Sequence, residues 1–402
     1  MSEWKEYTID QIASVQNGYT FKSNEYVPFF EDALEVLKMG HIEKGGGLRK
    51  SPKKNFVPRS EKLKKWILNK DDIVMAMTDM KDNVVILGVP ALIDKNNHYV
   101  LNQRVARIVA DNHIVDCNFL FNYLKWEEFL FALQSKASSG VQVNLSIETI
   151  KKSVLLLPSI EEQKAIASVL SSLDDKIDLL HRQNTALESI AETLFRQWFV
   201  EEAQEDWDDV QITKLFDVRD GTHDSPKQKT MGKPLITSKH INGNRLDFKS
   251  AYLISDDDFD KINQRSKVDK HDILISMIGT IGLIYLEQSD ELNYAIKNVG
   301  LFKTSQNQNW MAYTYFWLKS HLGKQFLDEH ISGSTQEYVS LGSFRSITFK
   351  KPPIEKLEEF NKIANGYLYK IKNNNSQIQT LEKLRDNLLP KLMSGEVRIQ
   401  DD

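Results

Sequence analysis

The sequence predicts an α+β protein in which two mixed α/β domains are separated by two long helices that pair as an antiparallel coiled coil. The first observation is a repeat: LPSIEEQKAIASVLSSLDDKI at residues 157–177 recurs as KPPIEKLEEFNKIANGYLYKI at residues 351–371, at a constant offset of 194. The second is that the segments before the two copies also resemble each other. Helical propensity is too weak a constraint to keep two segments in register over this length, so we infer an internal pseudo-twofold repeat.

The domain boundaries follow from the repeat. Each domain has about 150 residues, a usual size for a unit with its own core. We predict a first domain at 1–157, a first long helix at 158–203, a second domain at 204–351, and a second long helix with the C-terminal tail at 352–402.

Four features recur in the same order in both domains. They are an amphipathic opening that ends in glycine, a strand-like run that ends in His-Ile, an Asp-Ile pair that begins a strand, and a helix-like segment with Leu-Lys. Short β-rich runs lie between them. The matching residues are Gly18 and Gly221, His41 and His240, Asp72 and Asp272, and Lys125 and Lys319.

The repeated helices have coiled-coil character. Apolar residues alternate spacings of four and three along both, and such a seam over several heptads predicts helix pairing. Asn184 and Asn374 occupy seam positions, where one polar residue can fix the register at some cost in stability. Two ordinary amphipathic helices on separate cores remain the alternative. The first seam includes Ile166, Leu170, Leu173, Ile177, Leu180 and Leu187, and the second Phe360, Ala364, Tyr367, Ile371, Ile378 and Leu381.

The charge of the chain is segregated. The net charge is −4, but residues 158–209 hold 13 acidic and 4 basic side chains, whereas residues 352–402 hold 8 of each. The two domains are therefore mildly basic. Because local charge sets the attraction for phosphate, the acidic total does not exclude a nucleic-acid partner.

The composition points to the cytoplasm and away from membranes. The N-terminus is too polar for a signal peptide, and the longest apolar stretch, VVILGVPALI at 84–93, is about half of what a bilayer requires. A single cysteine, Cys117, excludes an internal disulfide and a cysteine-based zinc cluster. We expect a cytoplasmic protein without a membrane partner.

Motifs for catalysis are missing. The sequence has no G-x-x-x-x-G-K-[ST] loop, no G-x-G-x-x-G after a strand, and no H-x-x-x-H pair. Asp256, Asp257 and Asp258 form an acidic run, which we interpret as a turn that caps a helix. We therefore predict no catalytic residues, no metal site and no cofactor.

Binding to DNA is the function that the two domains favour. The segment 44–66 holds nine Lys or Arg residues against one acid, a composition suited to phosphate contacts, although a solvated loop is the alternative. The phosphate candidates are Arg49, Lys50, Lys53 and Lys54.

Candidates for base contacts lie on loops that follow the matched strands, because small polar side chains and lysines on loops suit base edges and phosphates. For each of them, a structural role in capping a turn remains open. In the first domain they are Lys22, Ser23, His41, Thr78, Asp79, Asn83, Arg104 and Gln142. In the second they are Thr222, His223, Asp224, Lys227, Ser238, Lys239, His240, Thr280 and Gln336.

The long helices resemble those of the specificity subunits of type I restriction-modification enzymes. The resemblance rests on Pro-x-Ile-Glu-Glu-Gln at 158–163, Leu-Phe-Arg-x-Trp-Phe at 194–199, and the tail LEKLRDNLLPKLMSGEVRI at 381–399. Both domains resemble the target recognition domains of that family, in NGYTF and DGTHDSP among other runs. PPIEKLEEF departs from the pattern because it lacks the Glu-Gln pair.

The resemblance implies a non-catalytic subunit whose two domains each recognise half of a bipartite double-stranded DNA target. The paired helices would set the spacer and dock modification subunits, two of them in our expectation, and restriction subunits would join the complex. S-adenosylmethionine, ATP and Mg²⁺ are then expected only in partner subunits. A coiled-coil scaffold without DNA recognition is one alternative, and a nuclease or methyltransferase with an unrecognised site is another.

Overall fold

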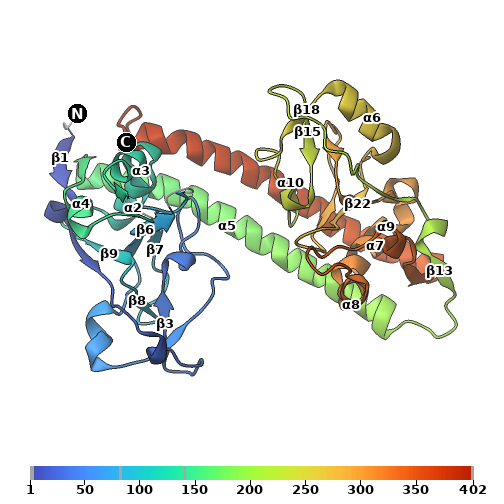
Figure 1. Ribbon diagram of the computed structural model, residues 1–402, viewed down its shortest axis with the longest axis horizontal. Coiled ribbons are helices and arrows are strands. Elements are labelled where there is room, and N and C mark those ends of the chain that lie inside the picture. Colours follow the sequence, from blue (N-terminus) through green and yellow to red (C-terminus); the bar gives the residue numbers. More distant parts are fainter. Residues whose placement is uncertain (1–3, 81–83, 140–141, 400–402) are drawn as a thin grey trace. The chain divides into compact units, whose positions relative to one another are not determined.

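The chain forms two compact units in the computed structural model, which describes residues 4–80, 84–139 and 142–399 (Figure 1). Unit 1 consists of residues 1–178 with 379–402, and unit 2 consists of residues 179–378. The division differs from the predicted one, in which the long helices were segments of their own. The reason is that the apolar face at each helix end belongs to the core of a domain.

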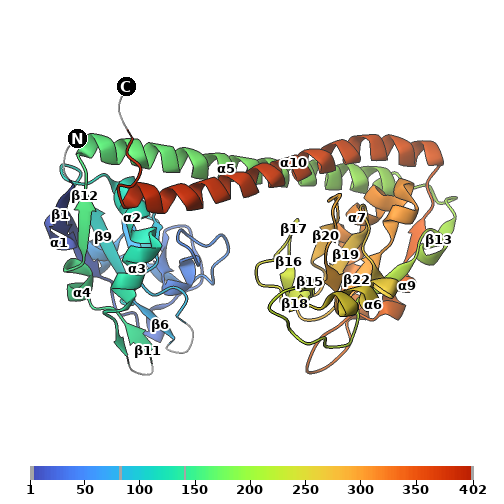
Figure 2. The same ribbon diagram turned by 90° about the horizontal axis from the view of Figure 1, so that it is seen from above.

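Unit 1 is built around two small sheets. An antiparallel sheet has the strand order β2-β9-β5-β7, and a second sheet has the order β4-β3-β8, with β3 and β8 parallel. β1 pairs with β12, which brings the start of the domain to the start of the first long helix. A third sheet, β10-β11-β6, lies at the end of the unit away from the long helices (Figure 2).

The bounds in unit 1 are β1 Lys5–Thr8, α1 Ile9–Ile12, β2 Ala13–Asn17, β3 Ala33–Leu37, β4 Phe56–Pro58, β5 Ile73–Ala76, β6 Thr78–Met80, β7 Pro90–Leu92, β8 Tyr99–Leu101, β9 Val105–Ala110, α2 Cys117–Lys125, α3 Glu127–Gln134, β10 Ser138–Ser139, β11 Gln142–Asn144, α4 Ile147–Lys151 and β12 Val154–Leu157.

Unit 2 repeats this topology. The sheet β14-β22-β19-β20 corresponds to β2-β9-β5-β7, and β18-β15-β21, with β15 and β21 parallel, corresponds to β4-β3-β8. β13 pairs with β23 as β1 pairs with β12. The predicted internal repeat is therefore confirmed at the level of strand order.

The bounds in unit 2 are β13 Asp209–Gln211, β14 Val218–Asp220, β15 Lys233–Ile236, β16 Ile241–Asn242, β17 Arg245–Leu246, β18 Leu253–Ile254, α6 Asp256–Ser266, β19 Ile273–Ser276, β20 Ile284–Leu286, β21 Ala295–Ile296, β22 Val299–Phe302, α7 Met311–Lys319, α8 His321–His330, α9 Leu341–Arg345 and β23 Thr348–Lys350.

The acidic run that opens α6 is the helix cap that the sequence predicted. The Ser255 hydroxyl accepts a hydrogen bond from the backbone N–H of Asp258, and the three aspartates form the first turn of the helix. Acidic residues at this position interact favourably with the positive end of the helix dipole. The run is structural.

Two long helices run through the chain, α5 at Ile160–Arg196, followed by a π-helical turn at Gln197–Glu201, and α10 at Ile354–Met393. They lie side by side and antiparallel (Figure 2). In unit 2, Asn374 Nδ2 donates to Asn184 Oδ1 over 2.8 Å, and in unit 1, Arg385 Nη1 donates to Asp174 Oδ1 over 2.8 Å. The predicted antiparallel pairing and the polar seam layer are confirmed.

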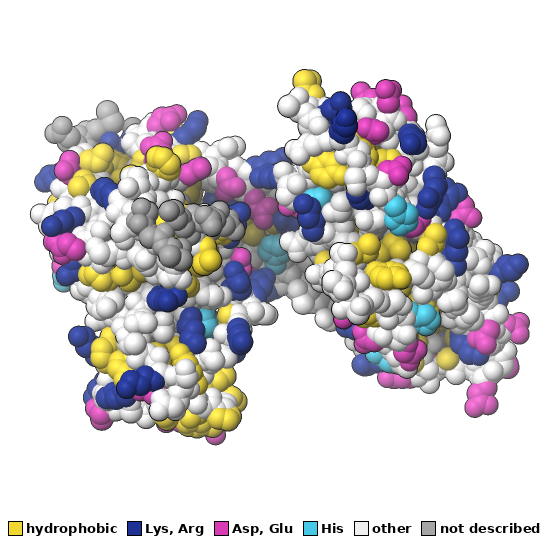
Figure 3. Space-filling view, in the orientation of Figure 1, with side chains coloured by type: hydrophobic (Ala, Val, Ile, Leu, Met, Phe, Trp, Pro, Cys, Tyr) yellow, Lys and Arg dark blue, Asp and Glu magenta, His cyan; other side chains and the backbone are white. Residues whose placement is uncertain are grey.

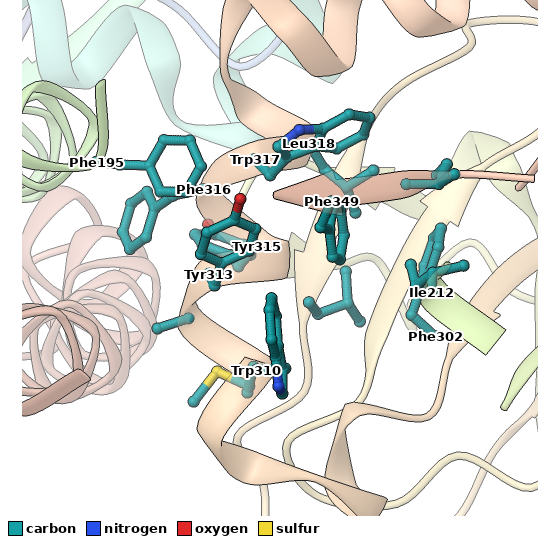
Figure 4. Close-up of a cluster of buried hydrophobic side chains, with 14 of the residues drawn as sticks. Phe195, Ile212, Phe302, Trp310, Tyr313, Tyr315, Phe316, Trp317, Leu318 and Phe349 are labelled. Carbon is teal, nitrogen blue, oxygen red and sulfur yellow. The ribbon is translucent and has the colours of Figure 1, made fainter. Parts of the chain in front are cut away.

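The helix ends complete the domain cores. In unit 2, Phe195 of the Leu-Phe-Arg-x-Trp-Phe motif packs against Tyr313 of α7, with ring centroids 5.1 Å apart (Figure 4). Phe199 of the same motif lies 5.0 Å from Tyr313 and also packs against Phe360 of α10. In unit 1, Leu170 and Leu392 join the core around Phe119. Each buried aromatic or leucine side chain contributes about 1.5–3 kcal/mol by leaving water, so both helices are needed by both cores.

The Glu-Gln pair of the repeat has a structural function at one end only. Buried Gln163 donates to the carbonyls of Pro158 and Ile114, and accepts from the backbone N–H of Asp116. Its equivalent, Leu357, packs in the apolar core of unit 2. There Asn361, one turn later, donates to the carbonyl of Asn309 over 2.7 Å, so the departure from the motif keeps a polar anchor at a shifted position.

The repeated His-Ile pairs mark a structural cap. The Nδ1 atoms of His41 and His240 accept hydrogen bonds from the backbone N–H three residues earlier, of Lys38 at 3.1 Å and Thr237 at 2.9 Å. Both imidazoles are buried, and His41 Nε2 lies 3.1 Å from Glu35 Oε1. We therefore withdraw both histidines from the residues expected to contact DNA, because their rings face the interior.

The two buried histidines make stability depend on pH. Burial lowers the pKa of His41 and of His240 below the usual value of about 6.5. As the pH falls through about 6.5, the unfolded chain takes up protons that the folded chain does not, so the free energy of unfolding decreases. We expect His240→Asn, whose Oδ1 can replace Nδ1 as acceptor, to weaken this dependence between about pH 7 and pH 5.5.

Chemical denaturation at several pH values measures the effect. His321→Asn is the matched control, since His321 is exposed, and it should leave the pH dependence as in the native chain. A His240→Asn chain with an unchanged dependence would show that this imidazole does not link protonation to folding.

Candidate nucleic-acid interface

The same close approach of two backbone segments occurs in both units, directly after the first strand of the main sheet. A Cβ on Gly18 would lie 2.3 Å from the carbonyl oxygen of Asn102, and a Cβ on Gly221 would lie 2.5 Å from that of Ile296. Only glycine fits such a contact. The loop after each glycine therefore lies beside a segment that connects two sheets of its unit. Tyr19 bridges Asn102, which lies between β8 and β9, and Thr222 bridges Lys297, which lies between β21 and β22.

In unit 2 this juxtaposition gathers polar side chains. His223 lies between two oxygen atoms, with Nε2 2.9 Å from Asp220 Oδ2 and Nδ1 2.8 Å from Asn298 Oδ1. Lys297 Nζ donates to Ser225 Oγ over 2.5 Å. The Ser238 hydroxyl donates to the carbonyl of Asn298 over 3.1 Å. The predicted residues Thr222, His223, Asp224 and Ser238 therefore share one surface with Lys297 and Asn298.

A groove of about 580 Å³ adjoins this surface. One wall is the loop with Thr222, Asp224 and Lys227, and the other is α6, with Lys261 and Arg265. Asp224 lies 3.8 Å from Lys261. The groove thus combines cationic side chains with a carboxylate and hydroxyls, a mixture suited to phosphate contacts and base edges.

The corresponding surface of unit 1 is more aromatic. The Thr20 hydroxyl donates to Gln103 Oε1 over 2.5 Å. Tyr19 packs against Trp66 with centroids 5.1 Å apart, and Lys62 Nζ lies 5.0 Å from the centre of the Tyr19 ring. Lys22, Ser23 and Arg104 are exposed around this cluster. Here too, predicted residues from distant segments lie together.

The basic loop of unit 1 is mostly exposed. Arg49, Lys50 and Lys53 lie on the surface, and Arg49 pairs with Glu43 at 3.4 Å. Lys54 differs, because its ammonium group lies 3.1 Å from the buried carboxylate of Glu35. Its charge is therefore partly used inside the protein. Figure 3 shows Lys and Arg side chains interspersed with apolar and acidic ones over the visible face of both units.

The remaining candidates occupy a second set of loops. Thr78 is buried and donates to Asn144 Oδ1 over 2.8 Å. Asp79 Oδ2 accepts hydrogen bonds from three consecutive backbone N–H groups, of Val85, Ile86 and Leu87; these bonds outweigh burial and lower its pKa. Both side chains hold the loop in shape. Gln142 is half-buried beside them.

The remaining candidates are four exposed residues of unit 2 and one position outside the described residues. Thr280 and Gln336 are exposed on two adjoining loops, since the backbone N–H of Gly279 donates to the carbonyl of Glu337. Lys227 and Lys239 are also exposed. Asn83 lies outside the described residues.

Sequence patterns alone did not identify several members of these surfaces. Lys297, Asn298 and Gln103 follow short strands of the second sheet, and Lys261 and Arg265 look like the solvated face of an ordinary helix. The repeat could have identified the residues after β8 and β21. Once Gly18 is matched with Gly221, the segments that follow these two strands and lie beside the glycines are matched as well. Nothing in the sequence indicated that α6 borders this surface.

The described residues offer neither a metal-ligand cluster nor a readily ionised thiol. Within residues 4–80, 84–139 and 142–399, His, Cys, Asp and Glu side chains nowhere gather in a group of three that could hold a metal ion. Burial raises the pKa of the Cys117 thiol to about 12, which opposes formation of a nucleophilic thiolate. Among the described helices, none combines the length and hydropathy of a membrane-spanning segment.

The chain is similar to known proteins over most of its length. The family model of the type I restriction modification DNA specificity domain matches residues 1–189 and again residues 204–383. The chain is 25% identical over 336 residues to the specificity subunit of the type I restriction enzyme MjaIX of Methanocaldococcus jannaschii, covering 76% of this chain and 74% of that one. To the EcoBI specificity subunit of Escherichia coli it is 23% identical over 433 positions, covering 99% and 87%.

A solved structure shares the fold. The S subunit of the type I restriction-modification system from M. genitalium superposes with a TM-score of 0.57 over 97% of this chain and 96% of that one, at 18% identity. The family model covers most of the chain and matches it twice, once for each unit's domain and adjoining helix. The chain therefore belongs to the family of type I restriction-modification DNA specificity subunits.

Proposed function

We propose that this chain is the subunit that selects the DNA target of a type I restriction-modification complex, acting in the cytoplasm. Each unit contacts one half of a bipartite double-stranded target. The observation that carries the proposal is the doubled loop surface, set by Gly18 in one unit and Gly221 in the other. A DNA target with two different half-sites requires two copies of one scaffold that carry different side chains.

The contacts divide into two kinds. Hydrogen-bonding side chains of the loop surfaces, Thr20, Gln103, His223 and Asn298 among them, are the proposed base contacts. Exposed cations on the flanks, namely Lys50 and Lys53 in unit 1 and Lys261 and Arg265 in unit 2, are the proposed phosphate contacts, which position the protein without selecting sequence. Thr78 and Asp79 support the loops from behind.

Catalysis belongs to partners in this proposal. The chain docks modification and restriction subunits, and the sites for S-adenosylmethionine, ATP and Mg²⁺ lie in them. Two exposed apolar residues support two copies of the modification subunit. Ile190 on α5 and Leu384 on α10 are equivalent in the repeat, and 46% and 45% of their surfaces are exposed. Equivalent apolar positions suit two identical partners.

A scaffold that organises partners without touching DNA is the second candidate. It would need the long helices and their apolar positions but not the loop surfaces. Binding of the complex to DNA at low salt separates the two proposals, because a scaffold would show no affinity that depends on lysines of the loops.

The basic loop should contribute affinity without specificity. Changing Lys50 and Lys53 to alanine should weaken binding to every sequence and reduce the salt dependence of log K by about 0.9 for each lost phosphate contact. Lys54 is left intact because it neutralises buried Glu35. Fluorescence titrations of the complex with duplexes at several salt concentrations measure the slope. The control, Lys151→Ala with Lys152→Ala at the C-terminal end of α4, removes the same charge and should leave the slope unchanged. An unchanged slope in the loop variant would contradict the assignment.

Each loop surface should determine its own half of the target. Thr222→Val with Asp224→Ala should change the bases recognised in one half-site and leave the other half-site as it was. Thr20→Val with Lys22→Ala is the reciprocal variant in unit 1 and should affect only the opposite half. Methylation mapping in cells that carry each variant gives both halves at once. A variant of one unit that alters both half-sites would refute separate recognition.

The long helices should set the length of the spacer between the half-sites. Four residues, about one helical turn, are inserted between Asn184 and Thr185 of α5 and four between Asn373 and Asn374 of α10, which adds ~6 Å to each helix and keeps Asn184 opposite Asn374. Local unwinding of the coiled coil can absorb the insertions. Since DNA rises ~3.4 Å per base pair, the mapped spacer should lengthen by about one or two base pairs with both half-sites conserved. An active variant with the native spacer would show that the helices do not set it.

A further inference from the structure

Each long helix carries an ion pair in its first turn, and the helix residue of the pair is acidic in α5 but basic in α10. In unit 1, Glu162 in the first turn of α5 accepts a hydrogen bond from Arg398 Nη2 over 2.7 Å, and the guanidinium lies 5.6 Å from the ring centre of Trp4. In unit 2, Lys356 in the first turn of α10 lies 3.2 Å from Glu202. Its ammonium is 5.5 Å from the ring centre of Trp207. The offset of 194 makes Glu162 equivalent to Lys356, so the charge at this helix position is reversed between the two copies, whereas the partners Arg398 and Glu202 correspond to Gln204 and Glu396.

Two layers within the helix pair are exchanged in the same manner. Buried Asn184 and Asn374 bond to each other, whereas their equivalents in the repeat, Ile378 and Leu180, are buried and apolar. In unit 1, Asp174 pairs with Arg385. The equivalents of these two in unit 2 are Leu368 and Ala191, which are also buried.

These exchanges decide which helices can pair. If two copies of α5 paired antiparallel in the same register, Glu162 would face Glu202 and Asn184 would face Leu180. If two copies of α10 paired, Asn374 would face Ile378 and Arg385 would face Leu368, while Lys356 would lie near Arg398 and also near Glu396, the equivalent of Glu202. Both arrangements place a polar or charged side chain opposite a buried apolar one, and the α5 pair also opposes two carboxylates, so both are disfavoured relative to the pairing of α5 with α10.

We infer that the two halves of this chain are specific for each other and reject a second copy of themselves. Residues 1–203, with α5, select residues 204–402, with α10, and disfavour any dimer in which equal helices pair. The device is the same that coiled coils use to choose partners, with charges at the ends and a polar residue in the seam. It concerns the chain alone and stands whether or not the proposed base contacts are right.

The test uses substitutions in the full chain that should favour pairing of α5 with α5 and of α10 with α10, between two molecules, over pairing of α5 with α10. In the converted variant, Glu202→Arg and Arg398→Glu make both internal ion pairs repulsive and both like-helix pairs attractive, and Asn184→Leu with Asn374→Leu removes the polar layer. The inverted control, Glu162→Lys, Arg398→Glu, Lys356→Glu and Glu202→Arg, reverses every charge and keeps the internal pairs complementary. Light scattering over a range of concentrations gives the dimer dissociation constant of each chain.

We expect the converted variant to dimerise with a Kd at least about tenfold below that of the native chain, and the inverted control to match the native chain. Cross-linking of mixed isotope-labelled and unlabelled chains should then join α5 to α5 and α10 to α10 between molecules. The inference is overturned if the converted variant dimerises no better than the native chain, or if its intermolecular cross-links join α5 to α10. It is also overturned if the inverted control dimerises as strongly. Should the converted variant lose its helical circular dichroism, Glu202→Arg with Arg398→Glu alone, which leaves the buried asparagine layer intact, decides the question by the same criteria.

Discussion

Each core of this protein is completed by two helix ends that come from distant parts of the chain. Leu170 of α5 and Leu392 of α10 enter one core, and Phe195 of α5 and Phe360 of α10 enter the other. Each unit buries part of its apolar surface against both long helices. The antiparallel pairing of α5 with α10 therefore contributes to the core of each unit.

The residues that are the same in both copies of the repeat are those that support the loops. Gly18 and Gly221 allow a strand end to approach a neighbouring backbone that any side chain would push away. His41 and His240 accept the same backbone hydrogen bond inside both units. These residues hold the framework constant, while the side chains on the loops differ completely, from an aromatic cluster beside Tyr19 to an acidic and basic groove beside Thr222. Such a division suits a protein whose two halves must differ in what they contact and agree in how they present it.

The chemistry of the chain is that of recognition. The carboxylates of half-buried Asp79 and buried Glu35 accept hydrogen bonds from backbone N–H groups or pair with cationic and imidazole side chains, so both stabilise the framework. The exposed cations stand on loops and on α6, where they can reach phosphate. The acidic charge is concentrated at residues 158–209, which comprise α5 and the connector after it.

The sequence by itself determined the repeat, the two long helices, their antiparallel pairing and the mixed α/β domains, because a constant offset and a heptad seam are periodic features that local geometry translates directly into structure. It also determined that Asn184 and Asn374 lie in the seam. Only the tertiary structure decided which polar residues face outward. His41 and His240 looked like surface residues because they repeat beside strand ends, yet the backbone turns their rings inward to cap a chain turn. Lys297 and Arg265 gave no local signal, since they join the surface through parallel strand pairing and the packing of α6, which depend on contacts between residues far apart in the chain.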